Sequence, residues 1–166
     1  MPTKCITRRC LQTMILEDTR QQAGKHNNVE RYFTQTGIPW SRQALYVGDY
    51  IIANDGRRAV DTKSGVLELI ADLHEQHERF AAECTRAQTA GIQLLILIEE
   101  KLPPGGLAAW ESPKDSRGRK LTQSDPETLR KAMLTMTAKY GVRFRFCDAR
   151  STGRIIVEYL TEGVIP

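Results

Sequence analysis

The chain has 166 residues, the usual length of one domain. Hydrophobic residues make up 40% and charged residues 27%, which excludes the disordered and fibrous classes of protein. The longest apolar run, Leu94 to Ile98, is far shorter than the ~20 residues of a membrane-spanning helix. We expect no signal segment, because Arg8 and Arg9 lead to Cys10, Leu11 and Gln12 rather than to an apolar run. We therefore expect a single-domain cytoplasmic protein without a membrane partner.

The net charge of +4 favours anionic partners without requiring them. The excess is local, because residues 1–31 hold six basic and three acidic side chains and begin with a basic N-terminal arm at 1–12. The four cysteines form no CxxC pair, which argues against structural zinc and favours a reducing compartment. His74, His77 and Cys84 share a predicted helix, where a solvated face is the favoured interpretation over a metal site.

Hydrophobic periodicity, caps and turn residues predict a mixed sheet sandwiched by helices. The first elements in chain order are a strand at 13–17, a helix capped by Asn28 and ending at Gly37, and a hairpin of Arg42 to Ala53 and Arg57 to Lys63. Helix then runs from 65 to 89 with a break near His74, and a strand follows at 92–98. The last elements are a helix from the capping box at Ser124 to Tyr140, a strand at 142–146 and a helix at 152–160.

Residues 101–124 form a long predicted loop that contains prolines, glycines and a basic run. Four basic residues and one acid lie between Lys114 and Lys120. Such a long connection inside a compact domain is typical of a functional loop or a disordered one. We expect it to act as a mobile lid over a bound polyanion.

Two aspartates lie on opposite arms of the predicted hairpin. A three-residue turn centred on Asp55 places Asp49 opposite Asp61, with Cβ atoms about 4.5–5.5 Å apart. Lys63 then shares their face. A two-residue turn at 55–56 shifts the register by one residue and separates the pair. Both registers stay open, as does the interpretation of two ordinary surface acids. In the first register, the opposed carboxylates call for a hard divalent cation.

A third carboxylate, Asp18, follows the first predicted strand, with Arg20 two residues further on. Three acids and a lysine are typical of sites that hydrolyse phosphodiesters. The acids hold one or two Mg²⁺ ions, which polarise the phosphate and generate hydroxide. The lysine holds or activates the water and stabilises developing charge, and Arg20 is suited to clamp a phosphate oxygen.

Three short motifs carry a family resemblance: Ile15 to Gln22, Val47 to Tyr50 and Val60 to Ser64. They resemble the Asp-x-Arg-Glu, Gly-Asp and Glu-Arg-Lys-Ser pattern of the XPF/Mus-type structure-specific endonuclease domain, in the PD-(D/E)XK nuclease superfamily. Leu95 to Glu99 is similar to the family's later strand that ends in an acid. The resemblance covers residues 13–100 well and 129–160 more loosely.

The resemblance implies a restriction-endonuclease-like α/β fold: a single domain with a mixed sheet flanked by helices. It also implies Mg²⁺-dependent cutting of branched, flap or junction DNA in repair or recombination, with Mn²⁺ as a substitute. It places Asp18, Asp49 and Asp61 as metal ligands. Lys63 and Arg20 join Asp49 and Asp61 as catalytic residues. A homodimer and a phage or prophage origin stay open.

The sequence departs from the family pattern at several positions. Asp61 replaces a glutamate, Thr62 replaces an arginine and Gln21 replaces a glutamate. The acid expected four residues after the lysine is Leu67, although Glu68 is adjacent. These changes affect substrate choice more than catalysis, because the central acids and the lysine are present.

Family members usually carry a paired helix-hairpin-helix module that grips duplex DNA, and we identify none in this sequence. We expect Arg117, Arg119 and Lys120 to contact phosphates in its place, with a plain solvated loop as an equal alternative. The favoured function is an endonuclease, and the alternative is a non-catalytic DNA-binding scaffold subunit of the same fold. An α/β interaction domain that binds no nucleic acid would leave the opposed carboxylates unexplained.

Overall fold

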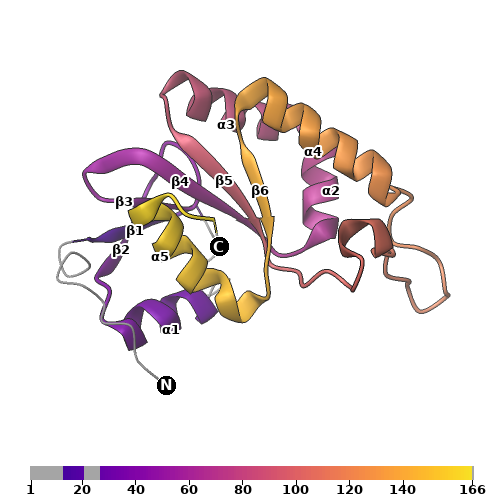
Figure 1. Ribbon diagram of the computed structural model, residues 1–166, viewed down its shortest axis with the longest axis horizontal. Coiled ribbons are helices and arrows are strands. Elements are labelled where there is room, and N and C mark those ends of the chain that lie inside the picture. The colour runs from indigo at the N-terminus through magenta and orange to yellow at the C-terminus, as the bar shows by residue number, and fades with distance from the viewer. Residues whose placement is uncertain (1–12, 21–26, 166) are drawn as a thin grey trace.

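The computed structural model describes residues 13–20 and 27–165, and within them a six-stranded mixed sheet lies between two helical layers (Figure 1). The sheet order is β2-β1-β3-β4-β5-β6, with β3 antiparallel to its neighbours and the other described strands parallel to one another. The predicted α/β fold class is confirmed. The strands are β1 (Ile15–Asp18), β2 (Trp40–Gln43), β3 (Tyr50–Ile52), β4 (Asp55–Lys63), β5 (Gln93–Ile98) and β6 (Arg143–Phe146).

The helices cover the two faces of the sheet separately. They are α1 (Asn27–Thr36), α2 (Val66–His74), α3 (His77–Thr89), α4 (Pro126–Tyr140) and α5 (Thr152–Glu162), with short 3₁₀ turns η2 (Gly106–Ala109) and η3 (Ala149–Ser151). Helices α1 and α5 pack on one face, and α2, α3 and α4 pack on the other (Figure 1). Because side chains alternate along a strand, β5 sends Leu94 and Ile96 to the α2–α3–α4 layer and Leu95 and Leu97 to the α1–α5 layer.

The first arm of the predicted hairpin is two strands, so the prediction of one strand from Arg42 to Ala53 is wrong. Strand β2 pairs in parallel with β1, and residues 44–49 then lead into β3. The buried loop residues Leu45 and Val47 continue the alternating pattern, which therefore resembles a strand. Gly48 interrupts it with φ of +71°. A Cβ on Gly48 would lie 2.9 Å from the carbonyl oxygen of Val60, so glycine lets this turn lie against β4.

Two predicted helix caps are also corrected. Asn28 lies inside α1, where its amide donates to Glu99 and to the carbonyl of Ala149, so it ties the helix to the ends of neighbouring elements. The N-cap of α4 is Asp125 rather than Ser124, because the Asp125 carboxylate accepts from two main-chain amides of the first turn. The predicted break near His74 is confirmed between α2 and α3.

The segment 101–124 is attached to the helical layer at its first half. Trp110 is buried, and its Nε1 donates to Glu100 Oε1 at 2.6 Å. A two-residue antiparallel bridge, Lys114 with Lys120, closes its basic tip. The proposed lid motion stays a prediction. Within 13–20 and 27–165, no helix has the length and apolar character needed to cross a membrane.

Candidate active site

The sheet register aligns the three predicted acids across adjacent strands. Glu17 pairs with Tyr50 and Tyr50 pairs with Val60, so Asp18, Asp49 and Asp61 each lie one residue from a paired position of the sheet. Asp18 N donates to Asp49 O at 2.8 Å, which continues the β1–β3 pairing to these two acids, whereas Asp49 N donates to Val60 O at 2.7 Å, one residue before Asp61. Asp61 and Lys63 follow Ala59 at a spacing of two residues, so their side chains belong to the α2–α3–α4 side of the sheet.

The first of the two predicted registers is confirmed for Tyr50 with Val60 and Ile51 with Ala59, next to the acids, whereas the predicted turn is wrong. The hairpin turns at Ala53 and Asn54, and Ile52 pairs with Asp55. A register shift between Ile51 and Ile52 restores the alignment nearer the acids. Asn54 adopts φ of +64°, a conformation that asparagine tolerates better than most residues.

Asp18 is buried and its carboxylate is already hydrogen-bonded. Arg20 Nε donates to Asp18 Oδ2 at 2.7 Å, and the main-chain amide of Leu45 donates to Oδ1 at 3.3 Å. Burial by itself raises the pKa of Asp18, but the hydrogen bonds from Arg20 and Leu45 outweigh it and hold that pKa below 3.8. The Arg20 side chain stays 59% exposed, so Asp18 orients a guanidinium that solvent can reach.

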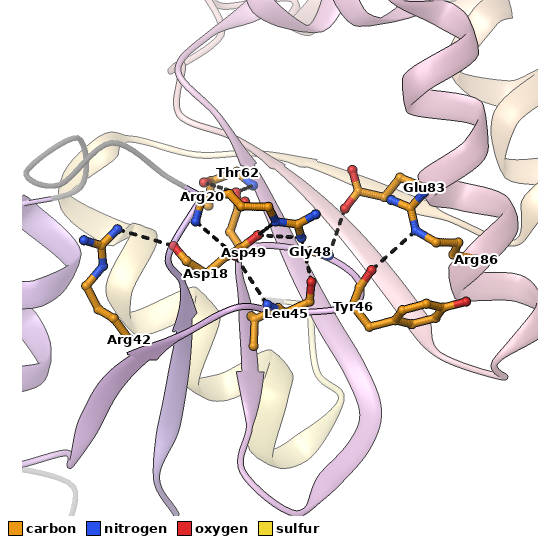
Figure 2. Close-up of polar contacts among 10 residues, drawn as sticks. All are labelled: Asp18, Arg20, Arg42, Leu45, Tyr46, Gly48, Asp49, Thr62, Glu83 and Arg86. Atoms are coloured by element: carbon orange, nitrogen blue, oxygen red, sulfur yellow. Dashed lines mark hydrogen bonds and ion pairs between the residues drawn. The ribbon is translucent and has the colours of Figure 1, made fainter.

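Asp49 is held by the residue that replaces the family's arginine. Both the main-chain amide and the hydroxyl of Thr62 donate to Asp49 Oδ2, each at 2.7 Å (Figure 2). This role could not be read from the sequence, where Thr62 is only a departure from the family pattern. One carboxylate oxygen of Asp49 is thus fixed from β4.

Lys63 lies between two buried carboxylates. Its Nζ is 2.6 Å from Asp61 Oδ2 and 2.6 Å from Asp72 Oδ2, and all three side chains are at most 7% exposed. Burial alone lowers the pKa of Lys63, but Asp61 and Asp72 raise it well above 10.5 and keep the ammonium charged. Nζ also lies 5.2 Å from the centre of the Phe80 ring, within the range of a cation–π contact.

Asp61 has the opposite electrostatic problem. Burial and the nearby charge of Asp49 raise its pKa well above 3.8, and Lys63 opposes that rise only in part. Oxygen donors at a buried, mutually repelling pair are the ligands that hard divalent cations prefer. Asp49 and Asp61 therefore fit such an ion. Across the described ranges, however, no three His, Cys, Asp or Glu side chains are grouped to hold one metal, and Asp18 is occupied by Arg20.

Residues 44–49 are hydrogen-bonded to both sides of the site (Figure 2). Arg20 donates to the carbonyl of Leu45 at 2.7 Å, and Glu83 Oε1 on α3 accepts from the amide of Gly48 at 2.9 Å. Arg86 on α3 donates to the carbonyl of Tyr46 at 3.4 Å. The loop that delivers Asp49 is thereby fixed from β1 and from α3.

Sequence reasoning missed Asp72 and Glu83, which the helices bring to the site. Each lies on a helix after the Lys63 motif, at a spacing that identifies no partner across the fold. The alternative acid Glu68 is not at the site, because it accepts from the amide and hydroxyl of Ser64 at the start of α2. Glu99 follows β5 and accepts from Asn28.

The remaining predicted residues lie elsewhere. Arg119 pairs with Asp115 at 2.8 Å within the tip of the 101–124 segment, which also contains Arg117 and Lys120. In Figure 1 this tip lies on the far side of α2 from β1 and β3, so the structure does not bring it to the aligned acids. Gln21 and the N-terminal arm 1–12 lie outside the described residues.

The ERCC4 domain model matches residues 18–159. The chain belongs to the ERCC4 domain family. This is a family of structure-specific DNA nucleases, so the resemblance inferred from the motifs is confirmed. Comparison with curated protein sequences gave no match.

Solved structures show the same fold as this ERCC4 domain. The structure of XPF from Aeropyrum pernix in complex with DNA is 17% identical with a TM-score of 0.61, over 89% of this chain and 62% of that chain. A second structure of XPF from Aeropyrum pernix is 20% identical with a TM-score of 0.61, over 89% of this chain and 63% of that chain. The ERCC4 chain thus spans less than two thirds of the length of these XPF chains.

Proposed function

We propose that this ERCC4 domain is a metal-dependent endonuclease that hydrolyses phosphodiester bonds in branched or flapped DNA, with roles in repair or recombination. The observation that carries the proposal is the buried Lys63 ammonium held beside Asp61, one strand from Asp49. Burying three charged groups often lowers stability relative to apolar residues of the same volume. The presence of this arrangement therefore favours a catalytic role over DNA binding alone. The DNA-bound state of the similar XPF structure supports DNA as the substrate.

Asp49 and Asp61 would hold Mg²⁺, with Mn²⁺ as a substitute. The ion supplies charge neutralisation at the phosphate and hydroxide from bound water near neutral pH. Thr62 orients Asp49 for this task through its two hydrogen bonds. Asp18, which the motif placed as a third ligand, acts here through Arg20, whose exposed guanidinium is placed to bind a phosphate oxygen.

Lys63 contributes positive charge rather than general-base catalysis. Because two carboxylates keep its pKa raised, it stays protonated and cannot take a proton from water near neutral pH. A protonated amine at this position donates to oxygens that gain negative charge in the transition state. This role differs from that of a lysine that activates water by deprotonation.

The proposed function is tested by incubating labelled flap, fork, four-way junction and linear duplex DNA with the protein. We expect cutting of branched DNA in Mg²⁺ or Mn²⁺, and none in EDTA, because the aspartate pair needs a cation to accept the phosphate. Tight binding to branched DNA without cutting in either metal would support the non-catalytic scaffold instead. Cutting that persists in EDTA would contradict the role of the aspartates.

Asp72 is expected to position Lys63 for this reaction. Asp72→Asn removes one of the two charges that fix Nζ, and we expect kcat for cleavage to fall about 10–100-fold, the usual effect of removing a residue that orients a site ligand. KM and DNA affinity in EDTA should not change. Glu68→Gln is the matched control, because Glu68 lies on the same helix but contacts Ser64. Equal losses in both variants would contradict the role of Asp72.

A further inference from the structure

A cavity of about 520 Å³ opens at the carboxyl end of β6, outside the aligned acids. Its volume falls in the range of small-molecule sites. The distance of the cavity from Lys63 follows from the strand pairing. Lys63 pairs with Ile98, and Ile98 pairs with Phe146 at the cavity wall. Two strand spacings separate them, or about 10 Å. The cavity is lined by Glu100, Lys101, Leu102, Phe144, Arg145, Phe146, Cys147 and Asp148.

The acids of the cavity wall already have partners. Glu100 accepts from the amide of Val66 at 2.7 Å and from Trp110 at 2.6 Å. Asp148 pairs with Arg150 at 2.9 Å, and the hydrogen bonds from Arg150 lower the pKa of Asp148 to about 2. Both carboxylates are therefore committed to the protein itself.

The cations of the wall are not committed. Within the described part of the chain, neither Lys101 nor Arg145 has a carboxylate at ion-pair distance, and Arg145 Nε is buried without a hydrogen-bond acceptor. A guanidinium without a carboxylate partner can still donate from its outer NH groups to an anion in the cavity, and such charge-assisted bonds are strong. The available charge of this cavity is positive.

The other walls are apolar and aromatic. Leu102, Phe144 and Phe146 are half-buried and pack against the core that the sheet forms with α2, α3 and α4. Their positions are thus held by the fold. Aromatic rings beside uncommitted cations form the usual combination that binds single-stranded nucleic acid, since rings stack on bases and cations contact phosphates.

We infer that this cavity binds an unpaired nucleotide of the DNA strand next to the bond that is cut. Lys101 contacts its phosphate and the base lies against Phe144 and Phe146. Arg145 alternates with these rings along the edge strand β6, so it reaches the phosphate from the other face of the sheet. The inference rests on the proposed function, because the same carboxyl edge of the sheet must then carry the substrate. It supplies a physical reason for selecting flapped DNA: a base inside a duplex is stacked and cannot enter.

The test is a binding measurement in EDTA, where no cutting interferes. Affinities of a fluorescent flap with an unpaired arm and of a linear duplex are compared for the unaltered protein and for Lys101→Gln, Arg145→Gln and Phe144→Leu. We expect each variant to bind the flap about 5–50-fold more weakly, and duplex affinity to change less than twofold for Phe144→Leu. The two charge variants should each lower the salt dependence of flap binding, by ~0.7 in slope.

Arg143→Gln is the matched control, because Arg143 lies on the same strand, is exposed and does not line the cavity. Equal weakening by Arg143→Gln and Lys101→Gln would show an effect of net charge only and overturn the inference. Unchanged flap affinity in Lys101→Gln would also overturn the inference, because Lys101 is exposed and the position tolerates substitution. A competition experiment in which an apolar peptide, but not an oligonucleotide, displaces the flap would overturn it too. Absence of cutting in Mg²⁺ with cavity-dependent binding intact would contradict only the proposed endonuclease.

Discussion

Lys63→Met is expected to lower the cleavage rate about 10²–10³-fold and the free energy of unfolding by about 3–5 kcal/mol. The rate falls because the site loses the cation that faces the reacting phosphate. Stability falls because Asp61 and Asp72 stay buried after their shared ion-pair partner is removed. Methionine keeps most of the side-chain volume, so the effect of the charge is separated from that of a cavity.

The stability loss should depend on pH. The pKa of Asp61 is raised in the folded protein by burial and by Asp49, so the fold favours its protonated form. Such a contribution is complete below the unfolded pKa and is lost as the pH rises through the folded pKa. Lys63→Met should therefore be most stable near or below pH 3.8 relative to the unaltered protein and lose stability as the pH rises.

Urea unfolding followed by circular dichroism measures both effects, and cleavage of labelled flap DNA measures the rate. Lys131→Met is the control, because Lys131 is 71% exposed and lies 3.8 Å from Glu127 on α4. An exposed pair of this kind contributes about 0–1 kcal/mol. If the free energy of unfolding of Lys63→Met equals that of Lys131→Met, the stabilising role of the buried ion pairs of Lys63 with Asp61 and Asp72 would be contradicted.

Asp61→Asn is expected to reduce cleavage about 10³-fold while it changes the free energy of unfolding by no more than about 1 kcal/mol. The neutral amide binds a divalent cation more weakly than a carboxylate does. Stability is preserved because the change removes the repulsion with Asp49, and Lys63 still pairs with Asp72. Activity and stability thus separate at Asp61, whereas both fall at Lys63.

Asp55→Asn makes the same change at the other end of β4, where Asp55 pairs with Arg57 at the hairpin tip. It should leave cleavage and its dependence on Mg²⁺ unaltered. Calorimetric titration with Mg²⁺ adds a direct measurement, since Asp61→Asn should bind the ion more weakly and Asp55→Asn should not. Full cleavage by Asp61→Asn would remove the aspartate pair from the proposed mechanism.

Much of the fold could be predicted because its signals are local. The apolar run of β5, the cap and proline at the start of α4 and Gly141 at its end each act within a few residues. The separation of β2 from β3 could not be predicted in this way. Leu45 and Val47 are buried against other elements, so their alternation reflects tertiary packing rather than an extended strand.

The candidate site also has some features that the local sequence predicts and others that only tertiary packing determines. The chain itself determines the family and the identity of Asp18, Asp49, Asp61 and Lys63, because short motifs preserve residue types at fixed spacing. Only the sheet register decides that the three acids meet at one end of adjacent strands, since one residue of slippage would turn a side chain to the other face.

The partners of these residues were decided by the tertiary structure alone. Asp72 reaches Lys63 from α2, and Glu83 reaches Gly48 from α3. A helix can present any of several acids to a sheet, and its packing angle and depth select which one makes contact. The sequence by itself therefore determined which groups carry the chemistry, and the folded structure determined the charge environment in which they act, because electrostatic coupling depends on distance and burial rather than on order along the chain.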